Sequence, residues 1–269
     1  MLSRFHKMHG LGNDFVIIDA RDTAVEMTAA RARAIADRKT GIGFDQLILL
    51  EPSENADMRM RTFNADGSEV EICGNATRAV AILIGGQATL DTAGGRIHID
   101  ALGGGQATVD MGVPRTGWDD IPLSYAMPTA PMPVGWEDLE APYAVSVGNP
   151  HIIFFVPDCD SVDLERLGPL IEHDPLFPAR VNVNVATVTG DHALRLRVWE
   201  RGAGLTRACG TGACASAVAA ISAGHVRSPV TVSLPGGDLQ IAWNAGAPIR
   251  MTGPATHVYT GEADWSRFG

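Results

Sequence analysis

Short apolar runs rich in β-branched and aromatic residues recur along the chain and predict strands. In the first half these runs are residues 14–19, 45–50 and 58–63. In the second half they are residues 151–156, 182–188, 193–199, 230–234 and 239–243. One longer apolar run in each half, within residues 71–84 and 206–220, predicts a buried helix. Thr28 can cap a further, amphipathic helix over residues 29–38.

The two predicted buried helices begin alike. Both EICGNATRAVAILI and TRACGTGACASAVAA contain Cys-Gly, a small polar residue and an apolar run. Cys73 and Cys209 are 136 positions apart, and the same offset sets Asn13 on Asn149, Gln46 on Asn182 and Asn64 on Glu200. Further on, LDTAGGRIHI resembles VSLPGGDLQI at an offset of 142, and VDMGVP resembles RMTGPA at 140. A common register through most of the chain indicates an ancient duplication.

The duplication predicts the fold. We expect an α/β (α+β) protein of two pseudo-symmetric domains, each a curved mixed or antiparallel sheet around a central helix, with the active site in the cleft between them. Residues 114–142 contain six prolines with Gly117 and Gly135, and are predicted to link the domains. The expected domains are residues 1–115 with 255–269, containing Cys73, and residues 116–254, containing Cys209.

Composition excludes several classes of protein. The formal charge of −10 argues against a nucleic-acid partner. No apolar run approaches the roughly 20 residues of a membrane-spanning helix. The first ten residues, MLSRFHKMHG, lack the apolar core of a signal peptide. We therefore expect a cytoplasmic protein with no membrane partner.

Cysteine and lysine usage limits the cofactors. Four cysteines are too few for a disulfide scaffold of 269 residues, and Cys159 and Cys214 are interpreted as small buried hydrophobic residues. No zinc site is expected, because Cys209 and Cys214 lie five apart with no CxxC or paired histidine nearby. Lys7 and Lys39 are the only lysines, and neither lies in a cofactor-binding context, which argues against pyridoxal phosphate. We expect no cofactor and no metal.

A thiol at a helix start can act in proton transfer. The N-terminus of a helix presents unpaired N–H groups and the positive end of the dipole, so we expect Cys73 and Cys209 to ionise more readily than free cysteine. The same N–H groups can hold a carboxylate, and Gly74 and Gly210 allow close approach to the backbone. Inverting a stereocentre by deprotonation needs a base on one face and an acid on the other, with exchanged roles in reverse. Two equivalent thiols suit that reaction.

Other polar residues have both a structural and a functional interpretation. Asn13 and Asn149 follow glycines and Asn64 precedes ADG, so each is also a turn signal. Gln46, Asn182 and Asn184 interrupt apolar strands and need partners; spacing does not choose between the last two. Glu200 and Arg201 form either a surface ion pair or a site for a zwitterionic group. His151 is either a satisfied strand histidine or an aid to a thiol.

The blocks HGLGNDFV, GIGFDQ, FNADGSEVEICGNATR, GNPH, ERGAG, ACGTGACA and LPGG resemble, in order, the signature of the diaminopimelate epimerase family. The resemblance implies conversion of LL-2,6-diaminopimelate to the meso form in lysine biosynthesis without pyridoxal phosphate or metal. It also implies two pseudo-symmetric α/β domains. One departure is visible: CGNAT stands where CGNGA is commoner, so Ala76 adds a methyl group.

The resemblance also implies roles for individual residues. Cys73 and Cys209 would be the acid–base pair, supported by His151, and Glu200 would act both in catalysis and in binding. The family pattern favours Asn182, the asparagine in FPARVN, over Asn184. The remaining residues would bind the substrate, namely Asn13, Gln46, Asn64, Gly74, Asn75, Asn149, Asn182, Arg201, Gly210 and Thr211.

Rival functions remain open at this point. A proline or hydroxyproline racemase of the same architecture should lack the Asn and Glu-Arg set that would bind a distant second amino-acid group. A non-catalytic binding protein or a thiol redox protein is the rival from another class. The expected partner is a small amino-acid substrate, and a homodimer is possible.

Overall fold

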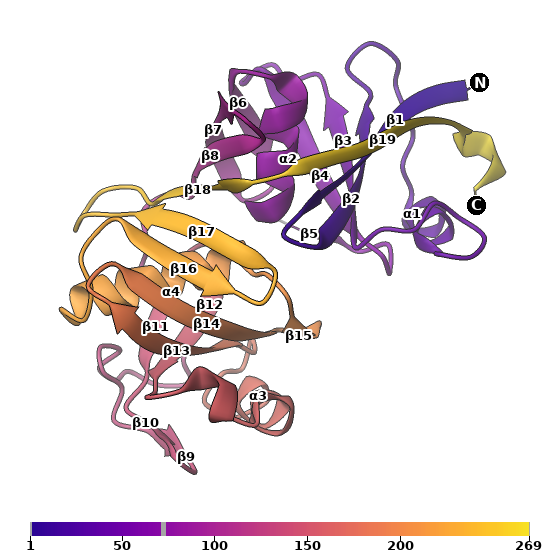
Figure 1. The fold of residues 1–269 in the computed structure, drawn as a ribbon. Helices are drawn as coiled ribbons and strands as arrows, with labels where there is room; N and C mark the ends of the chain where they lie inside the picture. The colour runs from indigo at the N-terminus through magenta and orange to yellow at the C-terminus, as the bar shows by residue number, and fades with distance from the viewer. Residues whose placement is uncertain (1, 71–73, 269) are drawn as a thin grey trace. The chain divides into compact units, whose positions relative to one another are not determined.

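The computed structural model describes residues 2–70 and 74–268, which form two compact units (Figure 1). The first unit is Met1–Val109 with Gly253–Gly269, and the second is Asp110–Thr252. The predicted domain boundaries, at residues 115 and 254, remain a prediction.

The first unit is a mixed sheet with two α-helices among its described residues. Strands β1 and β19 pair antiparallel, β1 and β2 antiparallel, β2 and β3 parallel, and β3 and β4 antiparallel. Strand β4 also pairs with β5 and β6, and β7 and β8 follow β6 in antiparallel order. The elements are β1 (Leu2–Gly10), β2 (Asn13–Asp19), α1 (Ala29–Ala36), β3 (Gln46–Glu51), β4 (Met58–Asn64), β5 (Glu69–Val70), α2 (Gly74–Ile84), β6 (Gln87–Thr92), β7 (Gly95–Gly103), β8 (Gln106–Asp110), β19 (Thr256–Asp264) and η2 (Trp265–Arg267).

The second unit repeats this plan. Strands β11, β12, β13, β14, β16, β17 and β18 are hydrogen-bonded in that order, and β15 pairs with the end of β14. The elements are β9 (Gly135–Trp136), β10 (Leu139–Glu140), β11 (Tyr143–Ser146), β12 (Pro150–Phe155), η1 (Cys159–Ser161), α3 (Leu164–Glu172), β13 (Asn182–Gly190), β14 (Ala193–Glu200), β15 (Gly204–Thr206), α4 (Gly210–Ser222), β16 (Val230–Leu234), β17 (Gly237–Ala242) and β18 (Arg250–Pro254).

Strand register confirms the duplication. Phe15 pairs with Gln46 between β2 and β3, and His151 pairs with Asn182 between β12 and β13, each residue 136 positions later. The same offset relates the Thr62–Val70 pair to Val198–Thr206. Because side chains alternate along a strand, a conserved register places equivalent residues on equivalent faces.

The register also corrects one sequence comparison. Ile99 pairs with Val109 and Ile241 pairs with Met251, so these last strands correspond at an offset of 142. The offset of 140 given by VDMGVP and RMTGPA is therefore wrong. Those two segments share few residues and straddle the end of a strand, where sequence likeness is a poor guide to pairing.

A mostly apolar helix contacts many strands of the sheet in each unit (Figure 1). Helix α2 contacts β1, β2, β6, β7 and β19, and α4 contacts β11 to β14, β16 and β17. Small residues allow this packing, since Ala76, Ala79 and Ala81 of α2 and Ala213, Ala217 and Ala220 of α4 are buried. A helix that is apolar on most of its surface is stable only when it is covered on most sides, so each sheet curves around its helix.

Helix α1 matches its prediction closely. Thr28 is the N-cap, and its hydroxyl accepts a hydrogen bond from the Arg31 N–H at 3.2 Å. The helix ends at Ala36, two residues earlier than the predicted Arg38. Its buried face joins Val16, Ile18, Leu47 and Leu49 in the core of the first unit.

The proline-rich stretch 114–142 is more than the linker that the sequence predicts. Ile121, Leu123, Met132 and Leu139 are buried in the core of the second unit, against α3 and strands β12 and β13. Prolines set backbone angles without preventing burial of the apolar residues between them. The stretch therefore belongs to the folded second unit.

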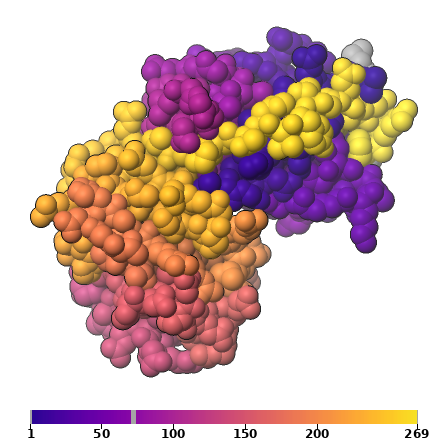
Figure 2. All heavy atoms as spheres, in the orientation of Figure 1, coloured from indigo at the N-terminus to yellow at the C-terminus, as the bar shows by residue number. Residues whose placement is uncertain are grey.

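The C-terminal strand lies on the surface of the first unit. Strand β19 runs over the N-terminal strands, yellow over indigo (Figure 2), and pairs with β1 from Leu2 to His9. Val258 is 54% exposed and Tyr259 46% exposed.

No helix among the described residues is long and apolar enough to cross a membrane.

Candidate functional site

Cys209 caps the central helix of the second unit. It is the N-cap of α4, in extended backbone conformation, and its sulfur accepts a hydrogen bond from the Gly212 N–H at 3.4 Å. The Thr211 hydroxyl lies 3.4 Å from the same sulfur. Cys209 is a free, buried thiol. The predicted helix-start position of this cysteine is confirmed.

The ionisation expected for Cys209 is corrected by its surroundings. Burial raises the pKa of the thiol well above its usual value, and the negative charge of Glu200 raises it further. The hydrogen bonds from Thr211 and Gly212 lower the pKa, but by less. Burial likewise raises the pKa of the Glu200 carboxyl, against hydrogen bonds from Thr206 and Cys209. The helix end favours the thiolate as predicted, yet the loss of solvation on burial and the charge of the neighbouring carboxylate disfavour it by more.

Glu200 is held at the end of β14 beside this thiol. The Thr206 hydroxyl, on the neighbouring strand β15, donates to Glu200 Oε1 at 2.6 Å. Glu200 and Arg201 are not an ordinary surface ion pair, because the Arg201 guanidinium instead donates to the Ala179 carbonyl at 2.9 Å. The carboxylate therefore faces the cysteine, and the guanidinium lies on the other side of the turn.

His151 and Asn149 lie on the same polar row as Cys209. Asn149 Nδ2 donates to Thr211 Oγ1 at 3.3 Å, and Asn149 Oδ1 lies 3.0 Å from His151 Nε2. His151 is completely buried, and burial lowers its pKa to about 3. A histidine with that pKa is neutral at neutral pH, so it acts here as a hydrogen-bonding group.

The two candidate asparagines of β13 have different partners. Asn182 donates to the Pro150 carbonyl at 2.9 Å, and its oxygen accepts the Arg201 N–H at 2.9 Å. Asn184 bonds to His151, to the Ile152 carbonyl and to the Asn182 carbonyl. Asn182 therefore ties the start of β12 to the turn that holds Arg201, and Asn184 supports His151.

The first unit has the equivalent arrangement. Asn75 Nδ2 donates to Asn13 Oδ1 at 3.3 Å. Asn13 Nδ2 in turn lies 3.0 Å from both Gln46 Oε1 and Asp45 Oδ2. Cys73 lies outside the described residues, while Gly74 begins α2 immediately after it. The structure thus brings Asn13, Gln46 and Asn75 together at the start of this helix.

Hydrogen bonding between Asn13 and Asn75 has a counterpart in the second unit. Asn149 and Thr211 are each 136 positions later and form the corresponding hydrogen bond. Asn64 ends β4 opposite Gln46, and its side chain donates to Ser68 Oγ at 3.2 Å in the turn that follows. The offset found in the sequence therefore identifies side-chain contacts as well as strands.

Helix α2 contains a buried guanidinium near its start. Arg78 is completely buried; it donates to the Asn75 amide oxygen at 2.8 Å, the Gly74 carbonyl at 3.3 Å and the Pro254 carbonyl at 3.3 Å. The Ala76 methyl group is also fully buried. Arg78 thus fixes both residues that follow Cys73 in the predicted carboxylate cradle.

Sequence reasoning missed several supporting residues. Glu172 of α3 is 2% exposed and accepts hydrogen bonds from the Trp199 indole at 2.8 Å and the Gly202 N–H at 3.0 Å. It therefore holds the turn that contains Glu200 and Arg201. No sequence pattern signals this role, because Glu172 ends α3 next to polar residues and only the fold shows that its carboxylate is buried.

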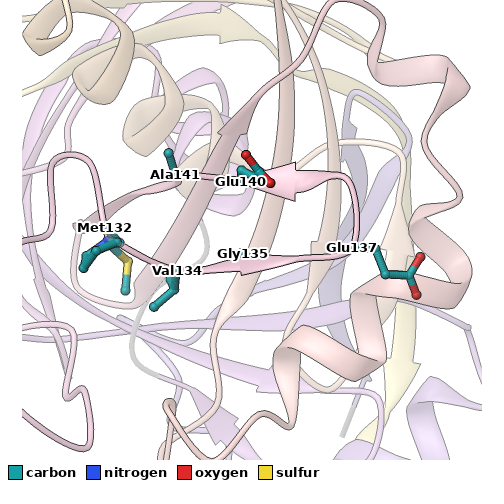
Figure 3. A pocket seen from close by; sticks show the side chains of 7 residues that line it. Met132, Val134, Gly135, Glu137, Glu140 and Ala141 are labelled. Atoms are coloured by element: carbon teal, nitrogen blue, oxygen red, sulfur yellow. The ribbon is translucent and has the colours of Figure 1, made fainter.

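A surface pocket lies apart from these residues. Its volume is about 460 Å³, and Met132, Pro133, Val134, Gly135, Glu137, Glu140 and Ala141 line it (Figure 3). Glu137 is occupied by a two-point ion pair with Arg166 at 2.7 Å. No predicted site residue lines this pocket. Among the described residues, no group of three or more His, Cys, Asp or Glu side chains could hold a metal ion.

Known proteins resemble the chain over its whole length. The family model described as diaminopimelate epimerase matches residues 5–117 and 143–258. A diaminopimelate epimerase of Rhizorhabdus wittichii is 68% identical, over 100% of this chain and 98% of the relative. One of Sphingopyxis alaskensis is 65% identical, over 100% of both chains.

Solved structures give the same fold at lower identity. A Bacillus anthracis phenazine biosynthesis protein of the PhzF family has a TM-score of 0.69 and 17% identity, over 98% of this chain and 99% of that chain. A match at this identity shows the fold alone.

Proposed function

The chain belongs to the diaminopimelate epimerase family, and from that premise we propose that it epimerises LL-2,6-diaminopimelate to the meso form with Cys73 and Cys209 as the acid–base pair. It is an isomerase of lysine biosynthesis that works without pyridoxal phosphate. The observation that supports the mechanism most directly is the Cys209 thiol at the start of α4, repeated in sequence by Cys73 before α2.

The reaction needs a base on one face of the α-carbon and an acid on the opposite face. In one direction the thiolate of one cysteine removes the α-proton, and the thiol of the other donates a proton to the opposite face. The thiolate and thiol have then exchanged, so the reverse reaction uses the same groups. Burial, and after it the negative charge of Glu200, keeps Cys209 protonated in the free protein. We propose Cys209 as the proton donor to an incoming substrate and Cys73 as the base.

The amides and helix starts would bind the substrate. Gly74 with Asn75, and Gly210 with Thr211, would hold the reacting carboxylate through helix N–H groups and stabilise charge that develops beside the α-carbon. The distal amino acid would bind to Asn13, Gln46, Asn64, Asn149, Asn182, Glu200 and Arg201. That set for a second amino-acid group favours diaminopimelate over proline. We propose that the reaction takes place in the cytoplasm and that the protein assembles as a homodimer.

Single cysteine variants test the mechanism. Cys73→Ala and Cys209→Ala should each lower kcat by about 10²–10⁴-fold, the usual contribution of a general acid or base. Cys214→Ala and Cys159→Ala are the matched controls, because both thiols are buried and neither caps α2 or α4, and near-normal turnover is expected. The wild type in heavy water should incorporate deuterium at the α-carbon. Near-normal turnover of either Cys73→Ala or Cys209→Ala contradicts the proposal.

A chirality-resolved assay separates the substrates. LL-diaminopimelate should be converted to the meso form, and L-proline should remain unchanged under the same conditions. Racemisation of proline at a comparable kcat/KM would replace the proposed substrate while keeping the two-cysteine chemistry.

A further inference from the structure

A row of hydrogen-bonded side chains connects a buried amide to the sulfur of Cys209. Asn184 Nδ2 lies 3.1 Å from His151 Nδ1, and His151 Nε2 lies 3.0 Å from Asn149 Oδ1. Asn149 Nδ2 lies 3.3 Å from Thr211 Oγ1, which lies 3.4 Å from Cys209 Sγ. The proposed mechanism gives Asn184 no role, although this side chain is completely buried.

Backbone carbonyls determine which way the Asn184 amide points. Its Nδ2 atom lies 3.0 Å from the Ile152 carbonyl oxygen and 3.3 Å from that of Asn182. A carbonyl oxygen only accepts, so the amide nitrogen must face these two atoms. The amide oxygen then lies against Gly212, where an added Cβ would approach it to 2.6 Å. The orientation of this amide is therefore set by the fold.

The amide orientation determines the tautomer of His151. Because the Asn184 group that faces His151 Nδ1 is an NH2 group, which only donates, that ring nitrogen has to be the one without a proton. The ring proton of the neutral histidine is then on Nε2, which donates to Asn149 Oδ1. Burial lowers the pKa of His151 to about 3; the contact with Asn184 raises it and the positive charge of Arg201 lowers it, both by less, so the ring stays neutral at working pH.

The direction of donation continues to the sulfur. With its oxygen facing His151, Asn149 turns its N–H toward Thr211 Oγ1. A hydroxyl that accepts this hydrogen bond retains one hydrogen, which is free to point at Cys209 Sγ. All the links then donate in the same direction, and hydrogen bonds in such a chain polarise one another.

We infer that Asn184 is a positioning residue, which fixes the His151 tautomer and so directs the Thr211 hydroxyl hydrogen onto the sulfur of Cys209. This row of hydrogen bonds favours the Cys209 thiolate, which is needed when this cysteine is the base. Its effect is opposite to that of Glu200, the carboxylate of β14 that faces the same sulfur. Its catalytic use rests on the proposed function. The direction of donation along the row is a property of the protein without substrate.

The tautomer can be measured on the unmodified protein. ¹⁵N NMR of the substrate-free wild type should show one histidine that stays neutral below pH 5, identified as His151 by its absence from His151→Gln, with the proton on Nε2 and none on Nδ1. A proton on Nδ1, or a charged ring at neutral pH, overturns the inference. This measurement is independent of whether the protein epimerises diaminopimelate.

A variant then tests the effect on the thiol. Asn184→Leu removes the donor to His151. The direction of donation along the row can then reverse, so that Thr211 donates to Asn149 instead of Cys209. We expect alkylation of Cys209, followed by peptide mass spectrometry across pH, to be about tenfold slower at neutral pH, equivalent to the loss of one hydrogen bond. The pH profile of kcat should move in the same direction, with KM little changed.

The matched control is Thr187→Val on the same strand. Thr187 Oγ1 accepts a hydrogen bond from the Cys159 N–H at 2.8 Å, and that pair is not part of the row leading to Cys209. Its Cys209 alkylation profile should equal that of the wild type. An unchanged profile in Asn184→Leu, or an equal shift in Thr187→Val, overturns the positioning role. If the tautomer and the alkylation change are found as expected but the wild type does not turn over diaminopimelate, the proposed function is contradicted instead.

Discussion

Equivalent positions of the two units share a backbone plan and differ in charge. Where the second unit has Glu200, the first has Asn64, and both positions lie at the end of a strand. Cys214, buried in α4, corresponds to Arg78, buried in α2. His151 corresponds to Phe15, and both are completely buried and pair with the next parallel strand. The duplication has thus kept the ladders and changed the charged groups around them.

The difference shows how one fold can supply two unlike proton-transfer groups. Backbone pairing and the helix start depend on local geometry, which is repeated in both halves. The pKa of a thiol depends instead on burial and on neighbouring charges, which a few substitutions can change. In the second unit a carboxylate raises the pKa of Cys209, whereas the first unit has an amide at that position and a buried guanidinium in its helix.

Acid should separate the two units most strongly. The pKa of His151 is lowered to about 3, from about 6.5 in an unfolded chain, so the unfolded state binds the proton first. Its contribution to stability is therefore complete above pH 6.5 and falls by about 1.4 kcal/mol per pH unit toward pH 3. In the first unit, burial raises the pKa of the Asp14 carboxyl, but hydrogen bonds from Arg38 and Lys7 lower it by more, to about 2. That contribution is lost only between about pH 4 and 2.

Hydrogen exchange between pH 7 and 4 measures this contrast. Amides of β12 and β13 should lose protection as the pH falls below 6.5, while those of β2 and β3 should keep theirs. His151→Phe, which copies Phe15, should remove most of the slope. The raised pKa of Glu200 acts in the opposite direction, so the comparison of the variant with the wild type isolates the histidine. Equal slopes for the two units would contradict the assignment.

Removing the buried guanidinium should cost the first unit about 3 kcal/mol. Arg78→Met leaves the Gly74 and Pro254 carbonyls and the Asn75 amide oxygen without this donor, and an unsatisfied buried acceptor costs about 1–3 kcal/mol. Cys214→Ala at the equivalent position removes only a small buried group and should cost less. Urea unfolding of both variants gives the two free energies. A similar loss for both would mean that Arg78 acts only by filling space.

Much of the fold could be predicted from the sequence because it depends on local patterns. The strand at 182–188, for example, alternates and is β-branched, and β13 indeed begins at Asn182. The Thr28 cap was found from one residue and the helix after it. The offset of 136 gave the equivalent strands, and the structure shows that it also relates the Asn13–Asn75 contact to the Asn149–Thr211 contact. Repetition supplied long-range information that a single segment does not contain.

Other features of the site depend on three-dimensional surroundings and could not be predicted. A helix start favours a thiolate, but the sequence does not show that Cys209 is buried beside Glu200. The choice between Asn182 and Asn184 needs their separate partners, since both are on one face of one strand. Glu172 is twenty-eight positions from Glu200, and only tertiary packing brings its carboxylate under the Gly202 N–H. The position of Cys73 lies outside the described residues.

Neutralising Glu200 tests the charge difference between the helix starts directly. Glu200→Gln keeps the shape and removes the charge that raises the pKa of Cys209, so alkylation of Cys209 should become faster at neutral pH. Epimerisation should still fall by about 10- to 100-fold, because a hydrogen bond to a charged group contributes about 1.5–3 kcal/mol. Thr206→Val, which removes only the donor to this carboxylate, is the milder control. Slower alkylation in Glu200→Gln would show that the carboxylate does not oppose the thiolate.

The smallest effect is expected from the carboxylate beneath the turn. Glu172 accepts from both Trp199 and Gly202, and Arg180 lies 3.7 Å from the same carboxylate. Glu172→Gln keeps the volume but turns an N–H toward one of these donors, so the turn that holds Arg201 should shift. Because Arg201 is proposed to bind the distal part of the substrate, KM should rise about tenfold, the value of one lost hydrogen bond, with a smaller change in kcat.

Trp199→Phe separates the two contacts of Glu172. It removes the indole donor but leaves the hydrogen bond from Gly202, so KM should stay within about twofold of the wild-type value even if the unfolding midpoint falls. A rise in KM in both variants would show that α3 acts on the site through general stability. A rise in Glu172→Gln alone would show that the buried carboxylate positions the Glu200–Arg201 turn, to which Asn64 and its hydrogen bond to Ser68 correspond in the first unit.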